Sequence, residues 1–132
     1  RALLGARARS FPEVKLFISI STPWGGERLT DHAPPLIPSW RDLRPEGAFL
    51  KTLFRERLPA DLEYDLLFGY RGARGLLRPN NDGTVTLESA LRMAAQAEAR
   101  RIYGFDESHA GILSSPQVVE VLNALFAEAE RR

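Results

Sequence analysis

Residues 13–20 read EVKLFISI, a short run in which apolar side chains follow one another almost without interruption. A run of this length is typical of a strand that is buried on both faces, as in a parallel sheet. Residues 21–26 (STPWGG) end the run, because a proline and a pair of glycines do not continue a strand. The sequence here predicts a strand that is buried on both faces and is followed at once by a loop.

Two further apolar runs predict a second and a third strand, at residues 64–70 (YDLLFGY) and 101–105 (RIYGF). Asp65, near the start of the second run, is expected at a strand edge or on the surface, without a functional role. Between the two runs, residues 80–83 (NNDG) form the strongest turn signal in the chain.

Helical patterns separate and follow the predicted strands. One helix is expected to begin at Pro45 and to end at Pro59, with an apolar stripe along one face, and another is expected over residues 87–99. A last helix begins with Ser115 as its cap and Pro116 in its first turn, and residues 2–9 resemble the end of an earlier helix. The stripe of the first helix comprises Phe49, Leu50, Leu53, Phe54 and Leu58, and that of the last Val118, Val121, Leu122, Leu125 and Ala129. The alternation predicts an α/β fold with a mostly parallel sheet and flanking helices.

The composition narrows the classes of protein that this chain can represent. The 132 residues suit one domain, and 44% hydrophobic with 27% charged residues is typical of a globular protein. A formal net charge of +1 gives no bulk attraction to nucleic acid or anionic lipid. No apolar run reaches the roughly 18 residues of a membrane span. With no cysteine, disulfide scaffolds, thiolate metal sites and cysteine nucleophiles are excluded.

Asp82 and His109 are the main candidates for catalysis. Asp82 lies in the turn after the second predicted strand, and His109 in the polar loop after the third. The loops that follow parallel strands meet at one edge of a sheet, where ligand sites collect. An aspartate that orients an imidazole, and an imidazole that takes a proton, make up two thirds of a Ser-His-Asp triad. A turn aspartate that caps its own turn and an ordinary loop histidine remain the structural alternatives.

Three stretches resemble bacterial α/β-hydrolases of the lipase/esterase type, including relatives of GPI-inositol deacylases. Residues 15–26 (KLFISISTPWGG) are similar to a strand and loop of these enzymes, and residues 66–72 with 81–91 (LLFGYRG, NDGTVTLESAL) to their acid-bearing strand and turn. Residues 104–126 (GFDESHAGILSSPQVVEVLNALF) resemble their histidine loop and final helix. The stretches occur in the family's order and span nearly the whole chain.

The resemblance implies that residues 1–132 form the C-terminal part of one α/β-hydrolase domain, with residues 27–58 as a small helical cap or lid. It implies Asp82 as the triad acid, in preference to Asp106 or Glu107, and His109 as the base. A loop beside the substrate pocket is implied for four residues: Thr22, Pro23, Trp24 and Gly25. Two hypotheses remain open for four aromatic residues: they line an acyl pocket, or they pack the cap on the core. These residues are Trp24, Trp40, Phe49 and Phe54.

The nucleophile of the family lies in a Gly-x-Ser-x-Gly elbow, and this sequence contains no such pattern. The five serines weighed as nucleophiles, all without that context, are Ser21, Ser89, Ser108, Ser114 and Ser115. By analogy with the family, we expect the serine a few residues upstream of Arg1, together with the donors that stabilise the oxyanion. The chain, which begins with arginine, is therefore expected to be a fragment that is inactive alone.

These observations lead to a set of functional expectations. The whole protein is expected to hydrolyse carboxylic esters of small molecules or lipids. No metal or organic cofactor is expected. A zinc site is not expected, because His32 and His109 lack the spacing of metal ligands. Alternatives are an acyltransferase on the same scaffold and a non-catalytic module that binds lipid or protein. A solvated loop is favoured over an anion clamp for Arg71, Arg74 and Arg78. The resemblance suggests an exported or envelope-bound bacterial protein, and the oligomeric state is not predicted.

Overall fold

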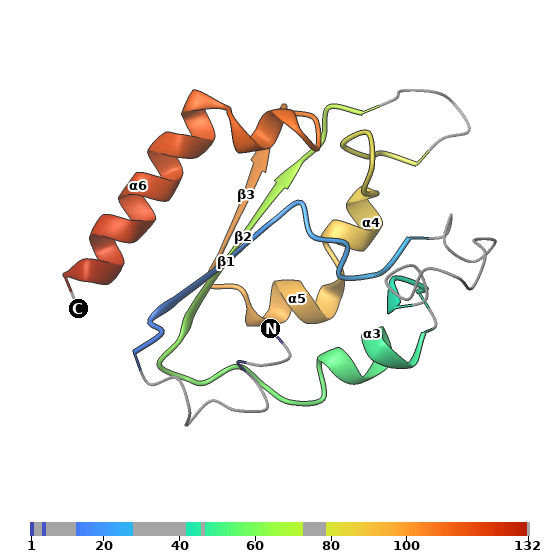
Figure 1. Ribbon diagram of the computed structural model, residues 1–132, viewed down its shortest axis with the longest axis horizontal. Helices are drawn as coiled ribbons and strands as arrows, with labels where there is room; N and C mark the ends of the chain where they lie inside the picture. Colours follow the sequence, from blue (N-terminus) through green and yellow to red (C-terminus); the bar gives the residue numbers. More distant parts are fainter. Residues whose placement is uncertain (2–3, 5–12, 28–41, 46, 73–78, 132) are drawn as a thin grey trace.

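The computed structural model describes residues 1, 4, 13–27, 42–45, 47–72 and 79–131. Three strands form one parallel sheet in the order β1 (Leu16–Ile20), β2 (Glu63–Gly69) and β3 (Arg101–Phe105) (Figure 1). The three strands and their parallel pairing confirm the α/β class that the sequence predicts.

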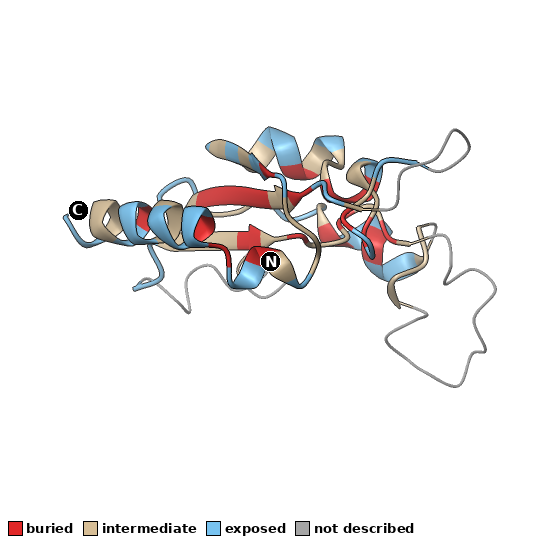
Figure 2. Ribbon diagram, turned by 90° about the horizontal axis from the view of Figure 1, so that it is seen from above, coloured by how far each residue is buried: buried red, intermediate tan, exposed pale blue. Residues whose placement is uncertain are grey.

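Helices cover both faces of this sheet (Figure 1). The long helix α6 (Pro116–Glu130) packs on one face, where Val118 and Leu125 join Leu67 of β2 in a buried cluster. Two short helices, α3 (Ala48–Leu53) and α5 (Met93–Glu98), pack on the other face. Successive strand residues point to opposite faces, so β1 and β2 contribute to both clusters, whereas β3 contributes Tyr103 and Phe105 to the cluster under α6. Figure 2 shows the buried residues gathered along the strands and on the inner sides of the helices.

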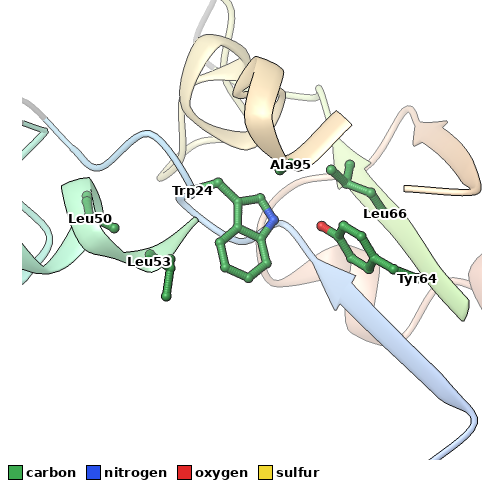
Figure 3. Close-up of a cluster of buried hydrophobic side chains, with 6 residues drawn as sticks. All are labelled: Trp24, Leu50, Leu53, Tyr64, Leu66 and Ala95. Carbon is green, nitrogen blue, oxygen red and sulfur yellow. The ribbon is translucent and has the colours of Figure 1, made fainter. Parts of the chain in front are cut away.

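An aromatic cluster fills the space between β1, β2 and α3 (Figure 3). The Trp24 ring lies 5.7 Å from the Phe54 ring, in an edge-to-face arrangement, and the Tyr64 ring stacks at 5.0 Å on Phe17. The Ser19 hydroxyl accepts the Trp24 indole N–H at 3.3 Å and lies 2.8 Å from the Tyr64 hydroxyl. Burial raises the pKa of Tyr64 to about 12. The side chains of Trp24 and Phe54 thus pack in this core cluster.

The helix expected between Pro45 and Pro59 is shorter than its apolar stripe suggests. It begins at Ala48, with Gly47 as its extended cap residue, and ends at Leu53, so Pro45 and Leu58 lie outside it. The backbone N–H of Gly47 bonds instead to the carbonyl of Arg44 in a preceding turn. The Leu58 side chain still packs against the first cluster, which explains why the pattern extended beyond the helix.

The single helix expected over residues 87–99 is also wrong. Two helices occupy this segment, α4 (Leu87–Ala90) and α5, and the backbone between them is extended at Arg92 (ψ 130°). The Arg92 guanidinium donates to the backbone carbonyls of Trp24 at 3.0 Å and Leu50 at 3.2 Å. These long-range bonds fix the break, and nothing in the local helix-forming sequence predicts them.

Asp65 is a further correction, because its side chain is fully buried in β2 and not at the surface. Several other expectations fall outside the described residues, namely all of the segment 2–9 except residue 4, residues 28–41 and 46 of the cap segment, which include His32 and Trp40, and also Arg74 and Arg78. In the described part of the chain, no helix combines the length and the apolar character needed to cross a membrane.

Candidate functional site: an aspartate–histidine pair at the carboxyl end of the sheet

Asp82 lies in a tight turn that its own side chain stabilises. Its carboxylate oxygen Oδ1 accepts the backbone N–H groups of Thr84 at 3.0 Å and Val85 at 2.7 Å, and its own N–H bonds to the Val85 carbonyl. Gly83 occupies the turn with a φ of 103°, in the region that favours glycine. The NNDG signal therefore forms the expected turn, and the turn fixes the direction of the carboxylate.

The chain after β3 runs beside the chain after β2 and brings His109 to this turn. The N–H groups of Tyr70 and Arg71 donate to the carbonyls of Phe105 and Glu107, each at 3.0 Å, and the His109 N–H donates to the Asp82 carbonyl at 2.8 Å. Gly69 makes the approach possible, because a Cβ there would lie 2.5 Å from the Glu107 carbonyl oxygen. The two loops are thus joined through their backbones before any side chain is considered.

The side chains of the pair meet at hydrogen-bond distance. His109 Nδ1 lies 2.9 Å from Asp82 Oδ2. The Asp82 side chain is 2% exposed and that of His109 is 40% exposed, so the carboxylate is buried while the ring reaches solvent. An ionised carboxylate can only accept, so neutral His109 carries its proton on Nδ1 and has its lone pair on Nε2. The arrangement can hold an imidazole ready to accept a proton.

The surroundings of Asp82 favour its ionised form. Burial by itself would raise the pKa of this carboxyl group. Hydrogen bonds from the Val85 amide, the His109 ring, the Thr84 amide and the Ser21 hydroxyl together outweigh burial, and the pKa of Asp82 lies below its ordinary value of 3.8. At neutral pH the pair therefore has a permanent negative charge behind the imidazole, which would stabilise the protonated ring.

The other two acids considered for this role do not take it. Asp106 and Glu107 lie in the same loop as His109, and both form ion pairs with the exposed Arg71, at 3.3 Å and 3.5 Å. The structure brings Asp82 alone of the three to His109 Nδ1 within the described residues. Arg71 thus has local carboxylate partners, as expected for a solvated loop.

The loop over Thr22, Pro23, Trp24 and Gly25 lies beside the helix that follows the Asp82 turn. The Gly25 N–H donates to the Ser89 carbonyl of α4 at 2.9 Å. The Thr22 hydroxyl bonds back to the carbonyl of Ile20 at 3.4 Å, and Pro23 is half-buried. The structure therefore joins this loop to α4, while the Trp24 ring points into the core (Figure 3).

Glu27 was not identified from the sequence as part of this region. Its carboxylate accepts the N–H of Thr86 at 3.2 Å, at the cap of α4, and it interacts electrostatically with Asp82 and His109. Partial burial raises the pKa of Glu27 above its ordinary value. Residue 27 was assigned from the sequence to the start of a cap. The contact with Thr86 could not be predicted, because only folding brings these two residues together.

Ser21 was weighed only as a nucleophile, and its contacts show a different placement. It is buried directly after β1, and its Oγ accepts the N–H of Gly69 at 3.2 Å. Of the other serines, Ser108 accepts the Gly111 N–H, Ser114 donates to the Gly111 carbonyl, and Ser89 and Ser115 are buried. Ser115 is the cap residue of α6 by position, although its side chain makes no capping bond.

Across the described ranges, no three histidine or acidic side chains lie close enough together to hold a metal ion. Comparison with protein-family models, with curated proteins and with solved structures finds no match to this chain.

Proposed function

We propose that this chain supplies the acid and the base of a serine-dependent carboxylic ester hydrolase of the α/β-hydrolase type. The observation that supports the proposal is the 2.9 Å contact between a buried, amide-bound carboxylate and an imidazole that is 40% exposed. The parallel sheet supports it as well, because the pair lies in the loops after β2 and β3, beyond the carboxyl ends of the strands.

In the proposed reaction, His109 Nε2 removes the hydroxyl proton of the nucleophilic serine while the serine oxygen bonds to the ester carbonyl carbon. The imidazolium that results is stabilised by Asp82. His109 then gives this proton to the leaving alcohol as the C–O bond breaks, which leaves an acyl-serine. A water molecule, deprotonated by His109, attacks the acyl carbon and releases the acid, and the proton returns to the serine.

The proposal places the nucleophilic serine outside residues 1–132, because no Gly-x-Ser-x-Gly pattern occurs within them. Loop residues Thr22 to Gly25 are proposed to border the substrate through their backbone. The substrate class, a lipid or small-molecule ester, rests on the resemblance of residues 15–26, 66–91 and 104–126 to lipases and esterases.

The test uses the natural protein that contains this chain. A fluorophosphonate probe should label a serine, and a short-chain p-nitrophenyl ester should be hydrolysed. His109→Ala should reduce turnover by at least about a hundred-thousandfold, more than the loss of Asp82, because the base is lost while the oxyanion donors remain. The matched control is His32→Ala, the other histidine of the chain, which should retain turnover.

Turnover by His109→Ala near the wild-type rate would disprove the assignment. A folded natural protein with neither labelling nor ester hydrolysis would favour the non-catalytic binding module instead. Efficient transfer of the acyl group to an added alcohol or amine, with little hydrolysis, would favour an acyltransferase on the same scaffold.

A further inference from the structure

Ser21, the first residue after β1, has an unusual backbone conformation. Its φ is 43°, and in the described part of the chain it is the one residue other than glycine with a positive φ. Residues with a Cβ adopt this region rarely and at a cost in free energy, so the conformation persists only where the surroundings impose it. Such strain collects at functional sites, which directs attention to what Ser21 contacts.

Ser21 is held to β2 at two points. Its N–H donates to the carbonyl of Leu67 at 2.9 Å, and its Oγ accepts the N–H of Gly69 at 3.2 Å. The residue is 3% exposed, so its hydroxyl proton must find an acceptor inside the protein. With the Gly69 N–H on the oxygen, the hydroxyl still has one proton to donate.

The neighbouring acceptor is the Asp82 carboxylate. A Cβ placed on Gly69 would lie 3.3 Å from the Asp82 Cβ, so the amide that binds Ser21 and the aspartate are direct neighbours. The Ser21 hydroxyl also interacts with the carboxylate and contributes to lowering the pKa of Asp82. A carboxylate can accept about four hydrogen bonds, and three other donors are placed, on Val85, Thr84 and His109.

We propose that Ser21 is a positioning residue of the Asp82–His109 pair. The strained backbone of Ser21 directs its hydroxyl proton at the Asp82 carboxylate. The catalytic importance of this contact rests on the function proposed above. The Gly69 N–H fixes the serine oxygen, the serine fixes the carboxylate, and the carboxylate fixes the imidazole. Ser21 thus acts through Asp82 and makes no contact with the reacting atoms.

The same placement argues against Ser21 as the nucleophile. A nucleophile must reach His109 Nε2, whereas Ser21 lies beside the carboxylate that binds Nδ1. Its burial would also keep an ester away from its oxygen. A buried serine in this region therefore has a defined role that requires no covalent chemistry.

The test compares Ser21→Ala with Ser21→Gly in the natural protein. Both remove the hydroxyl, but only the glycine variant relieves the strain at positive φ, so it should fold even where the alanine variant does not. The first readout is the pKa of the Asp82 carboxyl group, measured by NMR of isotope-labelled aspartate. It should rise by about one unit in both variants, because a hydrogen bond to a charged group is lost.

The second readout is ester hydrolysis, where kcat should fall about tenfold while KM stays unchanged, because the orientation of the imidazole and not substrate binding is affected. The matched control is Ser19→Ala, at a buried serine two residues earlier and within β1, which bonds to Tyr64 and Trp24 instead. Ser19→Ala should leave the Asp82 pKa and kcat unchanged. The charged groups that face Asp82 are His109 and Glu27, and neither is changed in these variants.

An Asp82 pKa that is unchanged in a folded Ser21 variant would overturn this assignment. An Asp82 pKa that shifts in both Ser21 variants but not in Ser19→Ala would support it, with or without esterase activity. A wild-type protein that hydrolyses no ester would overturn the proposed function, so the two failures are distinguishable.

Discussion

Two buried aspartates lie at opposite ends of the sheet, and the groups that bind their carboxylates differ. Asp65, near the amino end of β2, is 0% exposed, and Asp82, beyond its carboxyl end, is 1% exposed. Arg101 binds Asp65 through Nε at 3.1 Å, and Arg100 lies 3.7 Å away, whereas backbone amides and a histidine bind Asp82. Both arginines also pair with Glu128 of α6, so Asp65 belongs to an ionic network at the amino end of the sheet.

The pKa values of the two carboxyl groups shift in opposite directions. Burial raises the pKa of Asp65 and prevails over the hydrogen bond and charge of Arg101, in part because Glu63 and Glu128 add negative charge nearby. For Asp82, the directed hydrogen bonds prevail over burial. A buried carboxylate alone therefore does not mark a functional site. The difference lies in the partner, because Asp82 binds an imidazole that reaches solvent, whereas Asp65 binds guanidinium groups.

The largest expected effect is on turnover. Asp82→Asn in the natural protein should lower kcat for ester hydrolysis by about ten-thousandfold, because the amide no longer holds the imidazole in the required tautomer. Asp65→Asn, the same substitution at the other buried aspartate, should stay within about twofold of the wild type. Equal losses of kcat in the two folded variants would contradict this contrast, because turnover would then depend on a buried aspartate as such and not on its contact with the histidine.

The next effect is on stability at the amino end. Arg101→Met should lower the free energy of unfolding by about 3 kcal/mol in urea, because it removes the main partner of a fully buried carboxylate. Arg71→Met is the control, since the exposed pairs of Arg71 should contribute less than about 1 kcal/mol. A loss in Arg101→Met no larger than that in the control would show that the network is not needed for stability.

The opposite pKa shifts predict opposite pH dependences. The folded-state pKa of Asp82 lies below its ordinary value of 3.8, so its contribution to stability is fully present above pH 3.8 and is lost as the pH falls through the folded-state pKa. For Asp65 the folded-state pKa lies above 3.8, so its contribution is fully present below 3.8 and is lost as the pH rises through the folded-state pKa.

Unfolding of the wild type, Asp82→Asn and Asp65→Asn across acidic pH would measure both signs. The stability of the wild type relative to Asp82→Asn should increase with pH, and its stability relative to Asp65→Asn should decrease. The same sign for both differences would contradict the contrast between the two environments.

The smallest expected effect concerns Asp106, one of the two acids in the His109 loop that pair with Arg71 and not with the histidine. Asp106→Asn should change kcat by less than about twofold, because its exposed ion pair with Arg71 is weak and lies outside the pair. A loss comparable to that of Asp82→Asn would show that Asp106 takes over as the acid during turnover.

Much of the architecture is readable from the sequence. Three short apolar runs predicted β1, β2 and β3, and the alternation of strands and helices predicted their parallel pairing. Asp82 and His109 were predicted to meet because loops after neighbouring parallel strands share an edge, and they do. These predictions succeed because burial on both faces and turn chemistry are local properties that the residue pattern records.

Only the tertiary structure decided the rest, because the determining contacts join residues far apart in the chain. The break between α4 and α5 depends on carbonyls of Trp24 and Leu50, and the burial of Asp65 depends on Arg101. The attachment of the Ser21 side chain to β2 depends on the N–H of Gly69, 48 residues away. Periodicity and propensity describe neighbours along the chain, so they predicted where the pair would lie but not what holds it.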